Sequence, residues 1–68
     1  MSELTILFGL HVREQRKLKK ISQEKLALLC NIDRSYMGRI ERGEVNITLE
    51  KIYEIAKFLE IEVIELLP

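Results

Sequence analysis

The sequence predicts an all-α fold of five helices in a single domain that spans residues 1–68. The chain is too short to form a second hydrophobic core. Its only proline is the last residue, Pro68, so no proline interrupts a helix. Apolar residues recur at helical spacing, whereas β-branched residues never alternate with polar ones over the length of a strand.

The first helix is predicted over residues 4–19. Ser2 precedes it and can accept a hydrogen bond from a free amide of the first turn. Phe8 and Val12 are four residues apart and therefore lie on one side of this helix. We expect that side to face the core.

The second helix is predicted to begin after Ser22, which is an N-cap candidate, and to direct Leu26 and Leu29 toward the core. Only residues 30–33 then separate it from the third helix. A connection this short forces the two helices to cross at a steep angle. Residues 22–42 are therefore predicted to form a helix-turn-helix unit.

The third helix follows Asp33, a further N-cap candidate, and ends at Gly43. Met37 and Ile40 are expected to face the core. The opposite side then carries four exposed residues, Arg34, Ser35, Gly38 and Arg39. Arginines and a hydroxyl on an exposed helix are the groups that bind base edges in the major groove of DNA. The alternative is that both arginines are ordinary solvated side chains.

The fourth helix starts at Thr48 and has the most regular apolar pattern, formed by Leu49, Ile52, Ile55, Ala56 and Leu59. A short fifth helix is predicted over residues 63–67. Three apolar residues near the carboxyl end fall outside the simplest inward stripe: Phe58, Ile64 and Leu67. A chain of this size has little core left to bury them, so they are candidates for an interface with a second copy. The alternative is that the fifth helix folds back and covers them itself.

Charge is distributed unevenly although the net charge is zero. Residues 1–42 carry nine Lys or Arg and five Asp or Glu, whereas residues 43–68 carry two and six. This asymmetry suggests a basic surface for an anionic partner and an acidic end that points away from it. On charge alone, solvated helix surfaces explain the distribution equally well.

The composition excludes several other classes of protein. The longest apolar run, residues 6–10, is far shorter than the about 20 residues of a membrane span. Cys30 is the only cysteine, so no intrachain disulfide is possible and a cytoplasmic location is expected. One histidine, His11, and one cysteine are too few for a zinc site, and the chain has no glycine-rich phosphate loop. We therefore expect no enzyme, no metal and no cofactor.

Three segments resemble the Cro/repressor-like (XRE-type) helix-turn-helix family: VREQRKLKKISQEKLA, DRSYMGRIERG and NITLEKIYEIAKFL. DRSY followed by IERG and N-x-T-L is most similar to the small controller proteins of restriction–modification systems. The resemblance implies a lambda-repressor-like fold and a homodimeric transcription regulator that binds a twofold-symmetric operator. Antitoxins share much of the pattern, so an antitoxin or accessory subunit of a toxin–antitoxin pair is the alternative function. An adaptor without DNA binding would fit the zero net charge but not the exposed arginines.

The resemblance also implies residue roles. It assigns base reading to Arg34, Ser35 and Arg39, and contacts with the DNA backbone or phosphate to Gln23, Tyr36 and Asn46. Arg16 and Glu41 match a structural ion pair between the first helix and the end of the third. Lys20 and Asn31 stand where the family commonly has glycine, so a positive φ at either residue would lower stability.

Two of these roles have equal alternatives. Ser35 can be an ordinary first-turn residue, and Tyr36 can pack against the second helix. The expected partners are an operator in double-stranded DNA, a second copy of the chain and, at the promoter, RNA polymerase. No membrane contact is expected.

Overall fold

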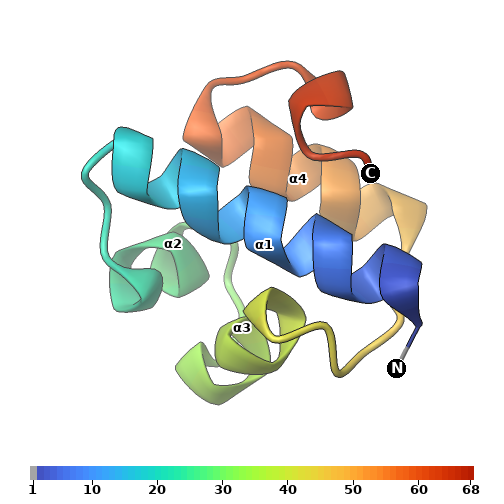
Figure 1. The fold of residues 1–68 in the computed structure, drawn as a ribbon. Helices are drawn as coiled ribbons and strands as arrows, with labels where there is room; N and C mark the ends of the chain where they lie inside the picture. Colours follow the sequence, from blue (N-terminus) through green and yellow to red (C-terminus); the bar gives the residue numbers. More distant parts are fainter. Residues whose placement is uncertain (1) are drawn as a thin grey trace.

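The structure is a computed structural model that describes residues 2–68. It contains four α-helices and a short 3-10 helix: α1 (Glu3–Leu18), α2 (Gln23–Leu29), α3 (Arg34–Glu41), α4 (Leu49–Leu59) and η1 (Val63–Glu65). In Figure 1, α1 crosses in front of α4, and α2 and α3 lie below them. The start of α1 and the carboxyl end both lie on the right. No helix within residues 2–68 has both the length and the apolar character needed to cross a membrane.

The all-α prediction is confirmed, but the predicted fifth α-helix is wrong. The segment forms only the three-residue 3-10 turn of η1, in which the Leu66 amide donates to the Val63 carbonyl at 2.9 Å. Leu66 is fully buried, and this tight turn directs its side chain into the core.

Three α-helices begin with the predicted hydroxyl caps. Ser2, Ser22 and Thr48 each accept a hydrogen bond from the backbone amide three residues later, at 3.1, 3.0 and 3.2 Å. Asp33 occupies the N-cap of α3, but its side chain makes no capping hydrogen bond, so the predicted side-chain cap is absent there.

All four α-helices end in the same hydrogen-bonded turn, the Schellman motif. In each, one residue adopts a left-handed backbone, and the next amide donates to the carbonyl five residues earlier at 2.9–3.1 Å. The left-handed residues are Lys20, Asn31, Gly43 and Glu60, with φ of 58°, 57°, 75° and 59°. Lys20 and Asn31 thus meet the condition under which a loss of stability is expected, whereas Glu60 was not singled out from the sequence.

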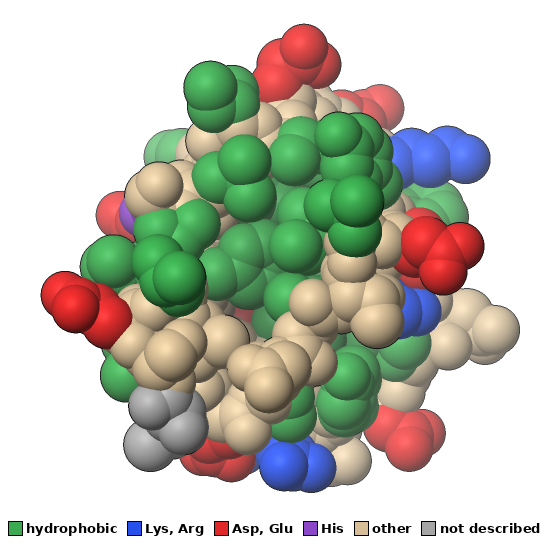
Figure 2. Space-filling view, turned by 90° about the vertical axis from the view of Figure 1, so that its right-hand side faces the viewer, with side chains coloured by type: hydrophobic (Ala, Val, Ile, Leu, Met, Phe, Trp, Pro, Cys, Tyr) green, Lys and Arg blue, Asp and Glu red, His purple; other side chains and the backbone are tan. Residues whose placement is uncertain are grey.

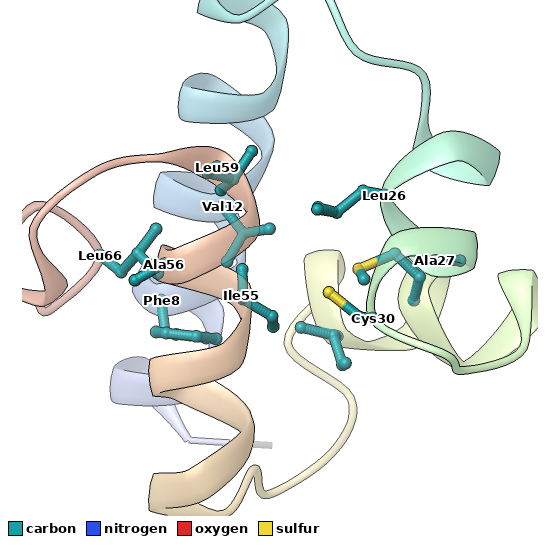
Figure 3. Close-up of a cluster of buried hydrophobic side chains, with 11 residues drawn as sticks. Phe8, Val12, Leu26, Ala27, Cys30, Ile55, Ala56, Leu59 and Leu66 are labelled. Carbon is teal, nitrogen blue, oxygen red and sulfur yellow. The ribbon is translucent and has the colours of Figure 1, made fainter.

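Side chains from all four α-helices and from Leu66 meet in a single core. Figure 3 shows the side chains of α1, α2 and α4 directed toward one another. The buried apolar residues are Phe8, Val12, Leu26, Ala27, Cys30, Met37, Ile40, Ile55, Ala56, Leu59 and Leu66.

Two apolar residues lie largely outside the core: Leu29, which was predicted to face it, and Leu49, which belongs to the apolar pattern of the fourth helix. Leu29 is only partly buried, and Cys30 occupies the core instead, because the chain turns away from the helix axis at the end of α2. Leu49 is 69% exposed, since it is the first residue of α4 and lies beyond the edge of the core.

Helix α1 packs directly against the backbone at the end of α3. A Cβ atom at Gly9 would lie 2.5 Å from two carbonyl oxygens of that segment, and one at Gly43 would lie 2.6 Å from the Ile6 Cα. The Thr5 hydroxyl also donates to the Gly43 carbonyl at 3.0 Å. Glycine at both positions thus allows α1 to fix the position of α3.

Candidate nucleic-acid interface

The connection between α2 and α3 consists of the four residues 30–33. Asn31 adopts the left-handed conformation that reverses the chain, and Ile32 then packs against the core. The two helices lie together at the lower left of Figure 1, away from the carboxyl end. One side of α3 is therefore open to solvent and the other faces the scaffold.

The two sides of α3 differ sharply in burial. Met37 and Ile40 are buried, whereas Arg34 and Ser35 are exposed and the Arg39 side chain is 52% exposed. We call the exposed set of Arg34, Ser35 and Arg39 the reading surface. Its residues are the three predicted to read bases.

Gly38 was predicted to lie on this outer side, but it is buried. The side chains of Gln23 and Arg42 cover it: a Cβ atom at Gly38 would lie 3.5 Å from the Gln23 Oε1 and 3.0 Å from the Arg42 Nη1. The prediction failed because it considered α3 alone, whereas long side chains from α2 and from the end of α3 extend across the glycine.

The structure brings Arg16, Glu41 and Gln23 together beneath the reading surface. The Arg16 guanidinium donates from Nε and Nη2 to the Glu41 carboxylate at 2.7 and 3.1 Å, and from Nη1 to the Ile21 carbonyl at 3.0 Å. Gln23 Nε2 donates to the same carboxylate at 3.2 Å. These contacts join α1, the loop after it, α2 and the end of α3.

This network is buried, and its charges depend on one another. Glu41 is 6% exposed as a residue, and the Arg16 side chain is 12% exposed. A buried carboxylate without a partner is strongly unfavourable, so Arg16 is needed to keep the end of α3 in place. Gln23 Nε2 carries a second amide hydrogen that this contact does not use, so it can also donate to DNA. The contact of Gln23 with DNA stays a prediction.

Tyr36 and Asn46, the other two predicted backbone contacts, lie in different surroundings. Tyr36 is partly buried against the core and lines a surface hollow of about 470 Å³ beside the turn. Asn46 is exposed in the loop between α3 and α4. It lies at the margin of an apolar hollow and not on either helix of the helix-turn-helix unit.

An ion pair that the sequence analysis missed lies at the end of α3. Arg42 Nε donates to Glu44 Oε2 at 2.7 Å, and Arg39 Nε lies 3.8 Å from Glu44 Oε1. The hydrogen bond from Arg42 lowers the pKa of the Glu44 carboxyl. The predicted helix end at Gly43 was the available signal, because it places the two following residues against the last turn of α3.

A second surface is apolar, and Figure 2 shows hydrophobic side chains gathered across its centre. A hollow of about 220 Å³ there is lined by Leu4, Thr5, Phe8, Asn46, Ile47, Ile52, Leu67 and Pro68. We call the apolar residues of this lining, Leu4, Phe8, Ile47, Ile52, Leu67 and Pro68, together with the exposed Leu49, the apolar face. It joins the starts of α1 and α4 to the carboxyl end.

The three predicted interface residues differ in exposure. Ile64 is 76% exposed and Leu67 is 43% exposed, whereas Phe58 is partly buried against the core of its own chain. Leu67 belongs to the apolar face, and Ile64 lines a neighbouring groove between α4 and η1.

His11 and Cys30 both have structural surroundings. His11 Nδ1 lies 3.1 Å from the Leu66 carbonyl oxygen, which links α1 to η1. Cys30 is buried, and this burial raises the pKa of its thiol. Within residues 2–68, no group of three His, Cys, Asp or Glu side chains is placed to hold a metal ion.

Two helices joined by a four-residue turn, with the second one exposing arginines from a rigid helical scaffold, define a helix-turn-helix DNA-binding domain. The sequence profile of the helix-turn-helix family matches residues 12–66.

Comparison with known proteins shows which group of helix-turn-helix proteins this chain resembles most. The control protein C.BamHI of Bacillus amyloliquefaciens is 42% identical over 67 residues, which are 97% of this chain and 83% of that protein. The control protein C.SmaI of Serratia marcescens is 40% identical over 84% of this chain and 68% of that protein. The crystal structure of the restriction–modification controller protein C.AhdI from Aeromonas hydrophila superimposes with a TM-score of 0.87 at 47% identity, covering 91% of this chain and 94% of that one. The chain belongs to the helix-turn-helix family of transcription regulators, among the restriction–modification control proteins.

Proposed function

We propose that this chain regulates the genes of a restriction–modification system by binding, as a homodimer, to a twofold-symmetric operator. The observation that carries the proposal is the reading surface, three polar side chains exposed on one side of α3 in a chain related to control proteins over nearly its whole length. The same relatives favour this role over that of a toxin–antitoxin subunit.

In this proposal, base reading and backbone contact are divided between two sets of residues. Arg34 projects from the first turn of α3, where its guanidinium can pair with O6 and N7 of guanine. Ser35 and Arg39 read neighbouring base edges. Gln23, Tyr36 and Asn46 contact the sugar–phosphate backbone, which fixes the register of the protein without reading the sequence.

We further propose that a second copy of the chain covers the apolar face. Leu4 and Leu49 are 66% and 69% exposed there, and Leu67 adds to them from the carboxyl end. Such a concentration of exposed apolar side chains marks an interaction surface. A twofold operator requires a protein with the same symmetry, which a self-complementary interface provides. The exposed Ile64 extends the interface, whereas Phe58 contributes only its outer edge.

This role also implies a further protein partner and a compartment of the cell. At a regulated promoter the dimer and RNA polymerase occupy neighbouring DNA, so RNA polymerase is the further protein partner of this proposal. The cytoplasm is its proposed compartment, because a chain with one buried cysteine needs no oxidising environment.

Selection of binding sites from a randomised duplex library tests this proposal. The expected product is a site with two half-sites related by a twofold axis, whose centres lie about 34 Å apart. The same site is expected upstream of genes that encode a methyltransferase or nuclease, and placing it before a reporter gene should make transcription depend on this protein.

Arg34→Ala serves as the control for the selection, because it should enrich sites with reduced preference at one base pair in each half-site. A selection that enriches no sequence, or one that enriches a site without symmetry, would contradict the proposal.

A further inference from the structure

Glu44 lies between two arginines at the end of the helix that carries the reading surface. Its carboxylate accepts hydrogen bonds from Arg42 Nε at 2.7 Å and from Arg42 Nη2 at 3.5 Å. Arg39 Nε lies 3.8 Å from its other side. One acidic side chain therefore contacts both the predicted base-reading Arg39 and a second arginine one turn along the chain.

The backbone fixes this position of Glu44. The Glu44 amide donates to the Arg39 carbonyl at 2.9 Å, within the turn that Gly43 closes with a φ of 75°. The turn brings residue 44 back against the last turn of α3. The proximity of the carboxylate to the arginines is thus a consequence of how α3 ends.

The three side chains are all accessible to a partner. The Arg39 and Arg42 side chains are 52% and 59% exposed, and that of Glu44 is 36% exposed. The hydrogen bond from Arg42 lowers the pKa of Glu44, so its carboxyl is ionised at neutral pH. A guanidinium binds a carboxylate and a phosphate with the same donor geometry, so the two are alternative partners for one arginine.

We propose that Glu44 competes with DNA for both arginines, with phosphate for Arg42 and with a base edge for Arg39, and thereby restrains the affinity of this protein for DNA. In the free chain the carboxylate neutralises one of the two arginines at the edge of the reading surface. On DNA, phosphate takes its place at Arg42 and a base edge takes its place at Arg39. This inference rests on the proposed DNA-binding function and adds a residue that limits it.

The exchange is feasible because the pair is exposed. Exposed ion pairs are weak, so phosphate can displace the carboxylate at small expense. The restraint applies most clearly to DNA without an operator, where phosphate contacts supply essentially all of the binding.

Glu44→Gln tests this proposal, because it keeps the size and hydrogen-bonding capacity of the side chain and removes the charge. Binding to a random-sequence duplex, measured over a series of salt concentrations, should become about two- to fivefold tighter. The plot of log K against log salt should become steeper by about 0.9, as for one additional phosphate contact. In the Arg42→Gln background, the same change should bring a smaller gain.

Glu50→Gln is the matched control, because it removes the same charge from an exposed residue of α4. Its effect on binding should not depend on Arg42, and melting temperatures should show that all variants fold. Unchanged or weaker binding by Glu44→Gln, or an equal gain with and without Arg42, would overturn the inference alone. A wild type that binds no duplex even at low salt would overturn the proposed function as well.

Discussion

The reading surface and the apolar face occupy different parts of this small molecule and are held in different ways. Beneath the reading surface, α3 is fixed by the buried carboxylate of Glu41 and by two close backbone contacts with α1. The apolar face combines short parts of α1 and α4, the loop between α3 and α4, and the carboxyl end around an open hollow.

This difference matches what each surface is proposed to bind. Base edges and phosphates have a fixed spacing, so the side chains that contact them need a rigid support. An apolar contact is less directional, and a second copy can fill the hollow with its own side chains. The following variants separate the support, the apolar face and the reading surface.

The largest effect is expected beneath the reading surface. Arg16→Ala leaves the buried Glu41 carboxylate without its main partner and should destabilise the domain by about 3–5 kcal/mol. The melting temperature should fall by more than about 10 °C. Arg13→Ala, which changes an exposed residue of the same helix, should leave it nearly unchanged. Equal melting temperatures for the two variants would show that the ion pair does not support the fold.

The second effect concerns the apolar face. Leu49→Glu places a charge in the proposed dimer contact and should weaken dimerisation by about 2–4 kcal/mol, as measured by sedimentation. The monomer should still fold, because Leu49 is 69% exposed. Ile64→Glu in the neighbouring groove should have a smaller effect, which would mark the edge of the interface. A wild type that sediments as a monomer at all concentrations would rule out the interface.

The third effect concerns the reading surface. Arg34→Ala should cost about 1–3 kcal/mol on the operator and relax the preference at one base pair per half-site. Asn46→Ala, at a position proposed to contact phosphate, should weaken binding to all sequences by a similar factor. Titrations of operator variants at one salt concentration measure both effects. Equal loss on operator and random DNA for Arg34→Ala would remove its base-reading role.

The smallest effect lies outside both surfaces. Lys20→Gly and Glu60→Gly should each stabilise the domain by up to about 1 kcal/mol, because both residues adopt a left-handed backbone that glycine accepts more easily. Gly43→Ala, by contrast, should destabilise the domain, because a Cβ atom at this position would collide with the Ile6 backbone. Thermal unfolding measures all three, and a lower melting temperature for either glycine variant would contradict the prediction.

Most of the fold could be predicted from local features of the sequence. The hydroxyl caps, the apolar spacing and the short connection at residues 30–33 predicted all four α-helices and the turn between α2 and α3. The exposure of Arg34 and Ser35 could also be predicted, because the burial of Met37 and Ile40 on the same helix leaves them on the opposite side.

Only the tertiary structure shows which residues near the ends of these helices are buried and which form ion pairs. Leu49 is exposed because it lies beyond the edge of the core, whereas Leu66 is buried because its side chain reaches into the core. The apolar periodicity of a single helix does not show where the core ends. Gly38 is covered by side chains from α2 and from the end of α3. The contact of Glu44 with two arginines depends on the turn at Gly43, which brings the chain back against α3. Helical periodicity assigns the side of a helix on which a residue lies, whereas burial and ion pairing depend on which other segments reach that side.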